Sequence, residues 1–75
     1  MNEIEEYYSN RARIDAIKNV LLNCGLMYDD RHKWYNPDGV KLRKDQQEYF
    51  EAAAPLFEQL IARNNELKKK FNIDV

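Results

Sequence analysis

The groups most capable of chemistry are concentrated in one stretch, between residues 28 and 44. Between Arg31 and Lys44, five basic residues stand against one acidic residue, and aromatic rings alternate with them. Basic groups interleaved with aromatic rings suit phosphates and unstacked bases. Aromatic and arginine side chains are equally typical of the hot spots of protein interfaces. The candidate partner-binding residues are Tyr28, Arg31, Lys33, Trp34, Tyr35, Lys41, Arg43 and Lys44.

A purely structural interpretation competes with this one: Trp34 and Tyr28 close the end of a helical core, and the charged side chains are merely solvated. The chain has 12 basic and 13 acidic residues. This balance argues against a general polyanion binder and against an acidic mimic of DNA. The leading hypothesis is therefore a protein-interaction module, an adaptor or an inhibitor. Two alternatives stay open: a small nucleic-acid-binding regulator that uses the basic and aromatic stretch, and a structural homo-oligomer.

Catalysis and metal binding have little support in the sequence. His32 is the only histidine, Cys24 the only cysteine and Ser9 the only serine, and threonine is absent. No recognised metal-ligand spacing is present, and the two glycines do not form a phosphate-binding loop. A two-helix chain also lacks the walls that enclose an ordinary substrate pocket. We expect no catalytic residue, no cofactor and no metal, and hence no enzyme.

The composition also predicts a compartment. A lone cysteine fits a reducing interior, and the acidic start of the chain does not resemble a signal peptide. No apolar run approaches the roughly 18 residues that span a membrane. We therefore expect a soluble cytoplasmic protein that does not bind membranes. Small size and charge-rich helices are also common in phage and mobile-element accessory proteins, a compositional analogy that suggests a phage-like source.

The elements that position the stretch are two helices. The second, over residues 45–71, has apolar residues at steps of three and four, which place them on one helical face. Asp45 and Glu48 predict its N-terminal cap. Pro55 removes a backbone hydrogen bond, so that this helix either kinks there or divides into two helices at Ala54. Asn72 is expected to end it, leaving residues 72–75 as a tail.

The first helix is predicted over residues 3–24, with Asn2 as its N-cap and Gly25 as the left-handed residue at its end. Leu26 should then fold back on Leu21. Its apolar face is expected to consist of Ile4, Tyr7, Tyr8, Ile14, Ile17, Val20, Leu21 and Cys24.

The connector, over residues 25–44, changes its pattern. Leu26–Tyr28 and Lys33–Tyr35 are rich in strand-favouring residues and could pair across the turn at 29–32. The alternative is an ordered loop pinned by Tyr28, Trp34 and Val40. Residues 36–39, Asn-Pro-Asp-Gly, predict a second tight turn.

Together these elements predict one small, mainly α domain over residues 1–75: an antiparallel helical hairpin whose connector holds either a tiny β-hairpin or a loop. Two features favour association. The aromatic residues, including Tyr7, Tyr8 and Tyr49, exceed what so small a core requires. The second helix also has an acidic first half and a basic second half, which would face each other in an antiparallel homodimer.

Overall fold

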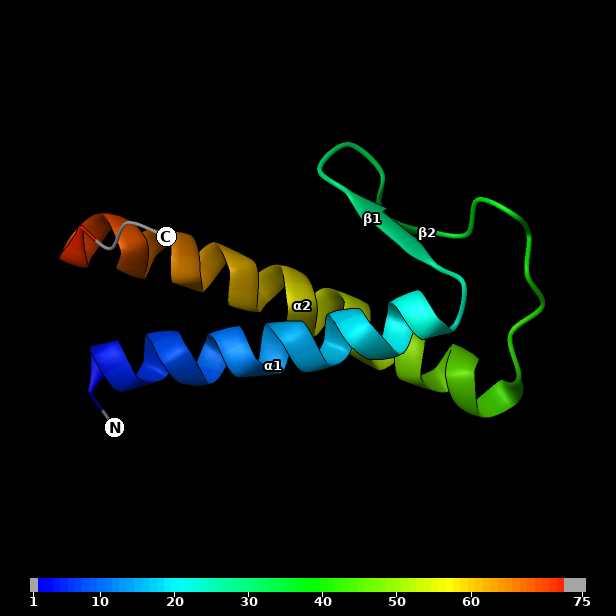
Figure 1. Ribbon diagram of the computed structural model, residues 1–75, viewed down its shortest axis with the longest axis horizontal. Helices are drawn as coiled ribbons and strands as arrows, with labels where there is room; N and C mark the ends of the chain where they lie inside the picture. The colour runs from blue at the N-terminus through cyan, green and yellow to red at the C-terminus, as the bar shows by residue number, and fades with distance from the viewer. Residues whose placement is uncertain (1, 73–75) are drawn as a thin grey trace.

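Residues 2–72 are described by a computed structural model, in which two antiparallel helices are joined by a connector that holds a small β-hairpin beside them (Figure 1). Helix α1 covers Glu3–Asn23 and helix α2 covers Lys44–Phe71. Strands β1 (Met27–Asp29) and β2 (Lys33–Tyr35) form an antiparallel pair. The mainly α helical hairpin is thus confirmed, and so is the β-hairpin in its connector. Residues 73–75 of the expected tail lie outside the described residues. Within residues 2–72, no helix is long and apolar enough to cross a membrane.

The two ends of α1 are fixed by the interactions that its sequence predicts. At the start, the Asn2 side chain accepts a hydrogen bond from the backbone N–H of Glu5, at 2.8 Å. At the end, the N–H of Leu26 donates to the Leu21 carbonyl at 3.2 Å, and that of Gly25 donates to the Leu22 carbonyl at 3.0 Å. Gly25 has a φ of 91°, so this is the Schellman arrangement, and it directs Leu26 into the core.

The start of α2 differs from the prediction. Asp45 is not the N-cap: the helix begins at Lys44, after an extended Arg43. The backbone N–H of Arg43 donates to Oε1 of Gln46 at 2.9 Å, and the Asp45 carboxylate instead contacts the Arg43 guanidinium at 3.2 Å. A start one residue earlier lets Gln46 satisfy this N–H, while Asp45 in the first turn still complements the positive end of the helix.

Pro55 lies inside one continuous α2, so the alternative of two helices meeting at Ala54 is wrong. Pro55 is on the exposed side, where water can bind the Glu51 carbonyl that lacks its usual partner. The helix ends as predicted. Asn72 adopts the left-handed conformation, with a φ of 53°, and its N–H donates to the Lys68 carbonyl.

Side chains fix the turn of the β-hairpin and also the turn that follows β2. Tyr28 pairs with Trp34 in the ladder, and the Asp29 carboxylate accepts the backbone N–H of Arg31 at 2.9 Å. The Asn36 side chain accepts the N–H of Val40 at 2.9 Å and donates to its carbonyl at 2.8 Å, closing the second turn. Because a two-stranded hairpin is unstable alone in water, its stability must come from packing on the helices.

The core lies between the helices and the β-hairpin. Trp34 places its ring 5.3 Å from that of Phe57, and Tyr28 places its ring 5.0 Å from the same Phe57. The buried hydrophobic cluster joins all four elements or their ends: Ile17, Leu21, Leu26, Trp34, Ala53, Phe57 and Leu60.

One layer of the helix interface is polar. Asn10 and Asn64 are both buried, and Nδ2 of Asn10 donates to Oδ1 of Asn64 at 3.0 Å. Nδ2 of Asn64 donates in turn to the Tyr7 carbonyl at 3.1 Å. On α1, Asn10 continues the seven-residue spacing of Ile17. It therefore lies in the seam, the row of α1 residues that faces α2, where the other positions are mostly apolar.

Several residues assigned to the apolar face of the first helix are exposed instead. Ile4, Tyr8 and Val20 keep 49%, 56% and 42% of their surface in solvent. The seam follows alternating steps of three and four from Tyr7, and these three residues lie beside it. The predicted face was therefore too wide, because it included apolar residues that lie beside the seam.

The Asn pair yields a first prediction. Asn64→Leu leaves the Asn10 amide buried without its partner, so we expect a loss of about 1–3 kcal/mol in unfolding free energy. Asn10→Leu should behave similarly, whereas the double variant should recover most of the loss or exceed wild type. Urea unfolding of all four proteins measures this cycle. A double variant whose loss equals the sum of the two single losses would contradict a coupled pair.

Candidate functional site

Two of the predicted partner-binding residues, Tyr28 and Trp34, are integral to the fold. The Trp34 ring is buried, and its Nε1 has no hydrogen-bond partner within residues 2–72. The Tyr28 hydroxyl donates to Oε1 of Glu58 at 3.0 Å, and burial together with this bond raises the Tyr28 pKa to about 12. Their main contacts are thus within the chain, as the structural interpretation of this stretch requires.

Three more candidates lie on the β-hairpin. Arg31 is exposed at the tip, and Lys33 places its Nζ 3.8 Å from Glu58. Tyr35 is half-buried, with its ring 5.2 Å from that of His32. The His32 ring contacts the Asp29 carboxylate at 2.9 Å, and hydrogen bonds from His32 lower the Asp29 pKa. His32 therefore helps to order this turn.

The remaining candidates, Lys41, Arg43 and Lys44, are exposed in the segment that leads into α2. Figure 1 shows this segment well apart from the tip of the β-hairpin, where Arg31 and Lys33 lie. The structure thus divides the predicted basic and aromatic surface into two places. Because Trp34 is buried, its ring is not accessible for stacking on a nucleic-acid base.

A pocket of about 420 Å³ lies between the end of α1 and the start of α2. Val20, Cys24 and Tyr49 supply its apolar surface, and Val20 and Tyr49 are 42% and 37% exposed. Its polar lining is Asn23, Arg43, Asp45 and Gln46. Of these seven residues, the sequence had suggested only Arg43 as a partner-binding residue. Val20 was placed on the apolar face of the first helix, whereas Tyr49 was counted among the aromatic residues that exceed what the core requires. The narrower seam spacing could have identified Val20 as a surface residue.

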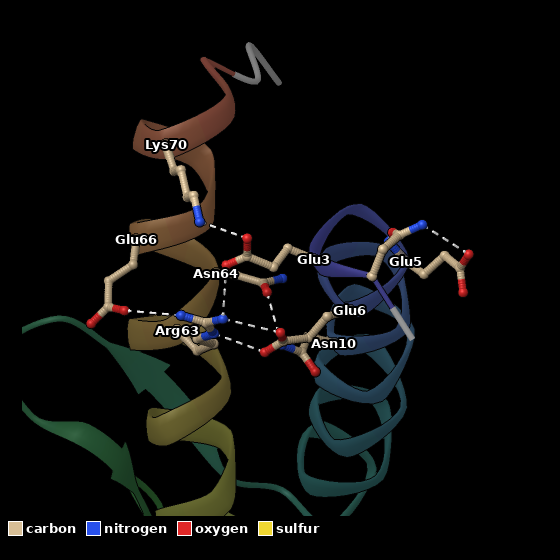
Figure 2. Close-up of polar contacts among 9 residues, drawn as sticks. Glu3, Glu5, Glu6, Asn10, Arg63, Asn64, Glu66 and Lys70 are labelled. Atoms are coloured by element: carbon tan, nitrogen blue, oxygen red, sulfur yellow. Dashed lines mark hydrogen bonds and ion pairs between the residues drawn. The ribbon is translucent and has the colours of Figure 1, made fainter.

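The opposite end of the helix pair carries a group of charges (Figure 2). From α2, Arg63 contacts Glu6 through Nε at 2.8 Å and through Nη2 at 3.1 Å. The same Nη2 lies 3.3 Å from Glu3, and Lys70 lies 2.6 Å from Glu3. The bond from Lys70 lowers the Glu3 pKa, and the bonds from Arg63 lower the Glu6 pKa. The basic half of α2 thus meets the acidic start of α1 within one chain.

Within residues 2–72, no group of three or more His, Cys, Asp or Glu side chains is arranged to hold a metal ion. Comparison with models of known protein families, with curated proteins and with solved structures found no match. The pocket between α1 and α2 and the charge group at the opposite end of the helix pair are therefore the features that bear on function.

The charge group predicts an acid-sensitive stability. Folding lowers the Glu3 and Glu6 pKa values below their ordinary 4.5. The stabilisation is therefore complete above pH 4.5 and is lost as the pH falls through the lowered values. We expect Arg63→Met to make the acid-side fall of the urea midpoint shallower. Lys69→Met, which removes an exposed neighbouring charge, is the control. An equally steep fall in Arg63→Met would contradict the assignment.

Proposed function

We propose that this chain is a non-enzymatic protein-interaction module, of the adaptor or inhibitor type, that binds its partner at the pocket between Val20 and Tyr49. The observation that carries the proposal is the pocket itself. Val20 and Tyr49 remain 42% and 37% exposed, although Cys24 beside them packs against the hydrophobic core. An aromatic residue beside a concave apolar surface is typical of the anchor point of a protein interface.

The surroundings of the pocket indicate the chemistry of the partner. Arg43 lines the pocket, and Lys41 and Lys44 are exposed on either side of it in sequence. Arg43 is paired with Asp45, whereas no ion pair within the described part of the chain involves either lysine. A partner segment that inserts an apolar side chain and carries flanking carboxylates would match this surface.

Three observations favour a protein over a nucleic acid as partner. The basic residues are divided between two places, Trp34 is buried, and the net charge is −1. A nucleic-acid surface generally gathers its positive charges along one face. The lone Cys24 suits a reducing compartment, so we place this binding in the cytoplasm.

Tyr49→Ser tests the proposal, with Phe71→Ser as a matched control. Phe71 is 38% exposed, close to the 37% of Tyr49, but it lies at the other end of α2. We expect Tyr49→Ser to weaken binding of the partner by at least about tenfold. Phe71→Ser should keep the binding affinity of wild type. Both should keep the helical content of wild type by circular dichroism.

The measurement is capture of partners from native lysate on immobilised protein, with and without nuclease, followed by titration of the purified partner. Capture that is equal for both variants would contradict the pocket as the binding site. Nucleic acid in the captured material, or capture lost with nuclease, would overturn the protein-binding proposal in favour of a nucleic-acid regulator.

A further inference from the structure

Helix α1 carries a second stripe of regularly spaced residues, separate from the seam that faces α2. Its members follow steps of four and three, so they share one face of the helix. All of them are exposed, and no ion pair within residues 2–72 involves Arg11, Asp15 or Lys18. The stripe consists of Ile4, Tyr8, Arg11, Asp15, Lys18 and Leu22.

This stripe is complementary to itself when two copies run antiparallel. Every pair of facing residues is then centred on the level of Arg13. Arg11 faces Asp15 of the second copy, and Asp15 faces its Arg11, which gives two opposite-charge contacts. Ile4 faces Leu22 at both ends of the contact. A parallel arrangement would instead place Arg11 against Arg11 and Asp15 against Asp15, which is repulsive.

The residues between the ends and the centre also match. Tyr8 faces Lys18 of the second copy, a combination in which an ammonium group can lie over an aromatic ring. A single contact of this kind would mean little. Here three kinds of residue pair agree on one axis, and a twofold axis reproduces each pair twice.

A groove beside the stripe can receive side chains of the second copy. It has a volume of about 430 Å³ and lies between α1, β1 and α2. Leu22 forms part of its lining on α1, Met27 on β1 and Ile61 on α2. In the antiparallel arrangement, the Ile4 and Tyr8 side chains of the second copy lie level with Leu22 and Lys18, at this groove. Met27, which is 47% exposed, would be covered there as well.

We propose that the chain forms a symmetric homodimer in which α1 packs antiparallel against α1 of a second copy. This arrangement differs from a dimer held by the charges of α2, because Arg63 and Lys70 already pair with Glu3 and Glu6 in their own chain. The stripe and the partner pocket are on different flanks of α1, so the two surfaces can be occupied at once. The dimer supplies the additional burial that so small a domain often requires.

Charge reversal gives a sharp test. In Arg11→Asp, the introduced carboxylate of one copy faces Asp15 of the other, and in Asp15→Arg, two guanidinium groups face each other. We expect each variant alone to dimerise at least about tenfold more weakly than wild type, since two attractive contacts become repulsive. An equimolar mixture of the two variants should form a heterodimer, because both contacts are then complementary. The double variant Arg11→Asp/Asp15→Arg should likewise dimerise as wild type does.

The control is Arg13→Asp, which makes the same charge change at an exposed position on the opposite face of α1. Sedimentation equilibrium over a range of concentrations measures the mass, and circular dichroism confirms that each variant keeps its helices. Wild type should have twice the mass of one chain, and Arg13→Asp should match it. A monomeric wild type, unaffected single variants, or a mixture and a double variant that both fail to dimerise would each overturn the proposal. Partner capture at the Tyr49 pocket is measured separately, so the failure of one proposal is distinguishable from the failure of the other.

Discussion

The structure depends on one fixed register between two helices, and the Asn10–Asn64 hydrogen bond is the contact that defines it. Apolar side chains in a helix pair tolerate sliding by a turn, whereas two buried amides do not. In this register Ile17 and Phe57 belong to one buried cluster, and the β-hairpin packs Trp34 on the Phe57 ring. A slip of one turn would leave the Asn10 and Asn64 side-chain amides buried without hydrogen-bond partners. It would also remove the surface on which the β-hairpin packs.

Residue spacing predicted most of this architecture. The helix lengths, the Asn2 cap, the Schellman end at Gly25 and the strand pair all follow from local chemistry. The misses on the faces of α1 have one physical origin: an apolar residue beside the seam resembles one within it, and a polar residue within it is overlooked. Val20 and Tyr8 were thus placed on the apolar face of the first helix, while Asn10 was not. The Asp45 cap failed for another reason, because Gln46 satisfies the Arg43 N–H when the helix begins one residue earlier. The site was harder still, since the pocket combines residues from two helices that are distant in sequence.

Helix α1 has different chemistry on each of its faces. One face packs on α2, and a second forms a flank of the pocket through Val20 and Cys24. The third bears the alternating apolar and charged residues that include Arg11 and Asp15. Mixed use of this kind explains why α1 shows no single apolar stripe, although its seam positions are well defined. Helix α2 has one buried apolar face. The charges near its two ends pair within the chain, Asp45 with Arg43 and Lys70 with Glu3.

The two ends of the helix pair differ in the length of chain that must be ordered to form them. Leu21 and Leu26 are near neighbours in sequence, whereas the bond from Lys70 to Glu3 closes a loop of 67 residues. Because the entropy of closing a loop rises with its length, we expect folding to begin at the β-hairpin and proceed toward the charged end. The Glu3–Lys70 contact should then form last and open first. Backbone amides near it should exchange with deuterium sooner than those around Leu21.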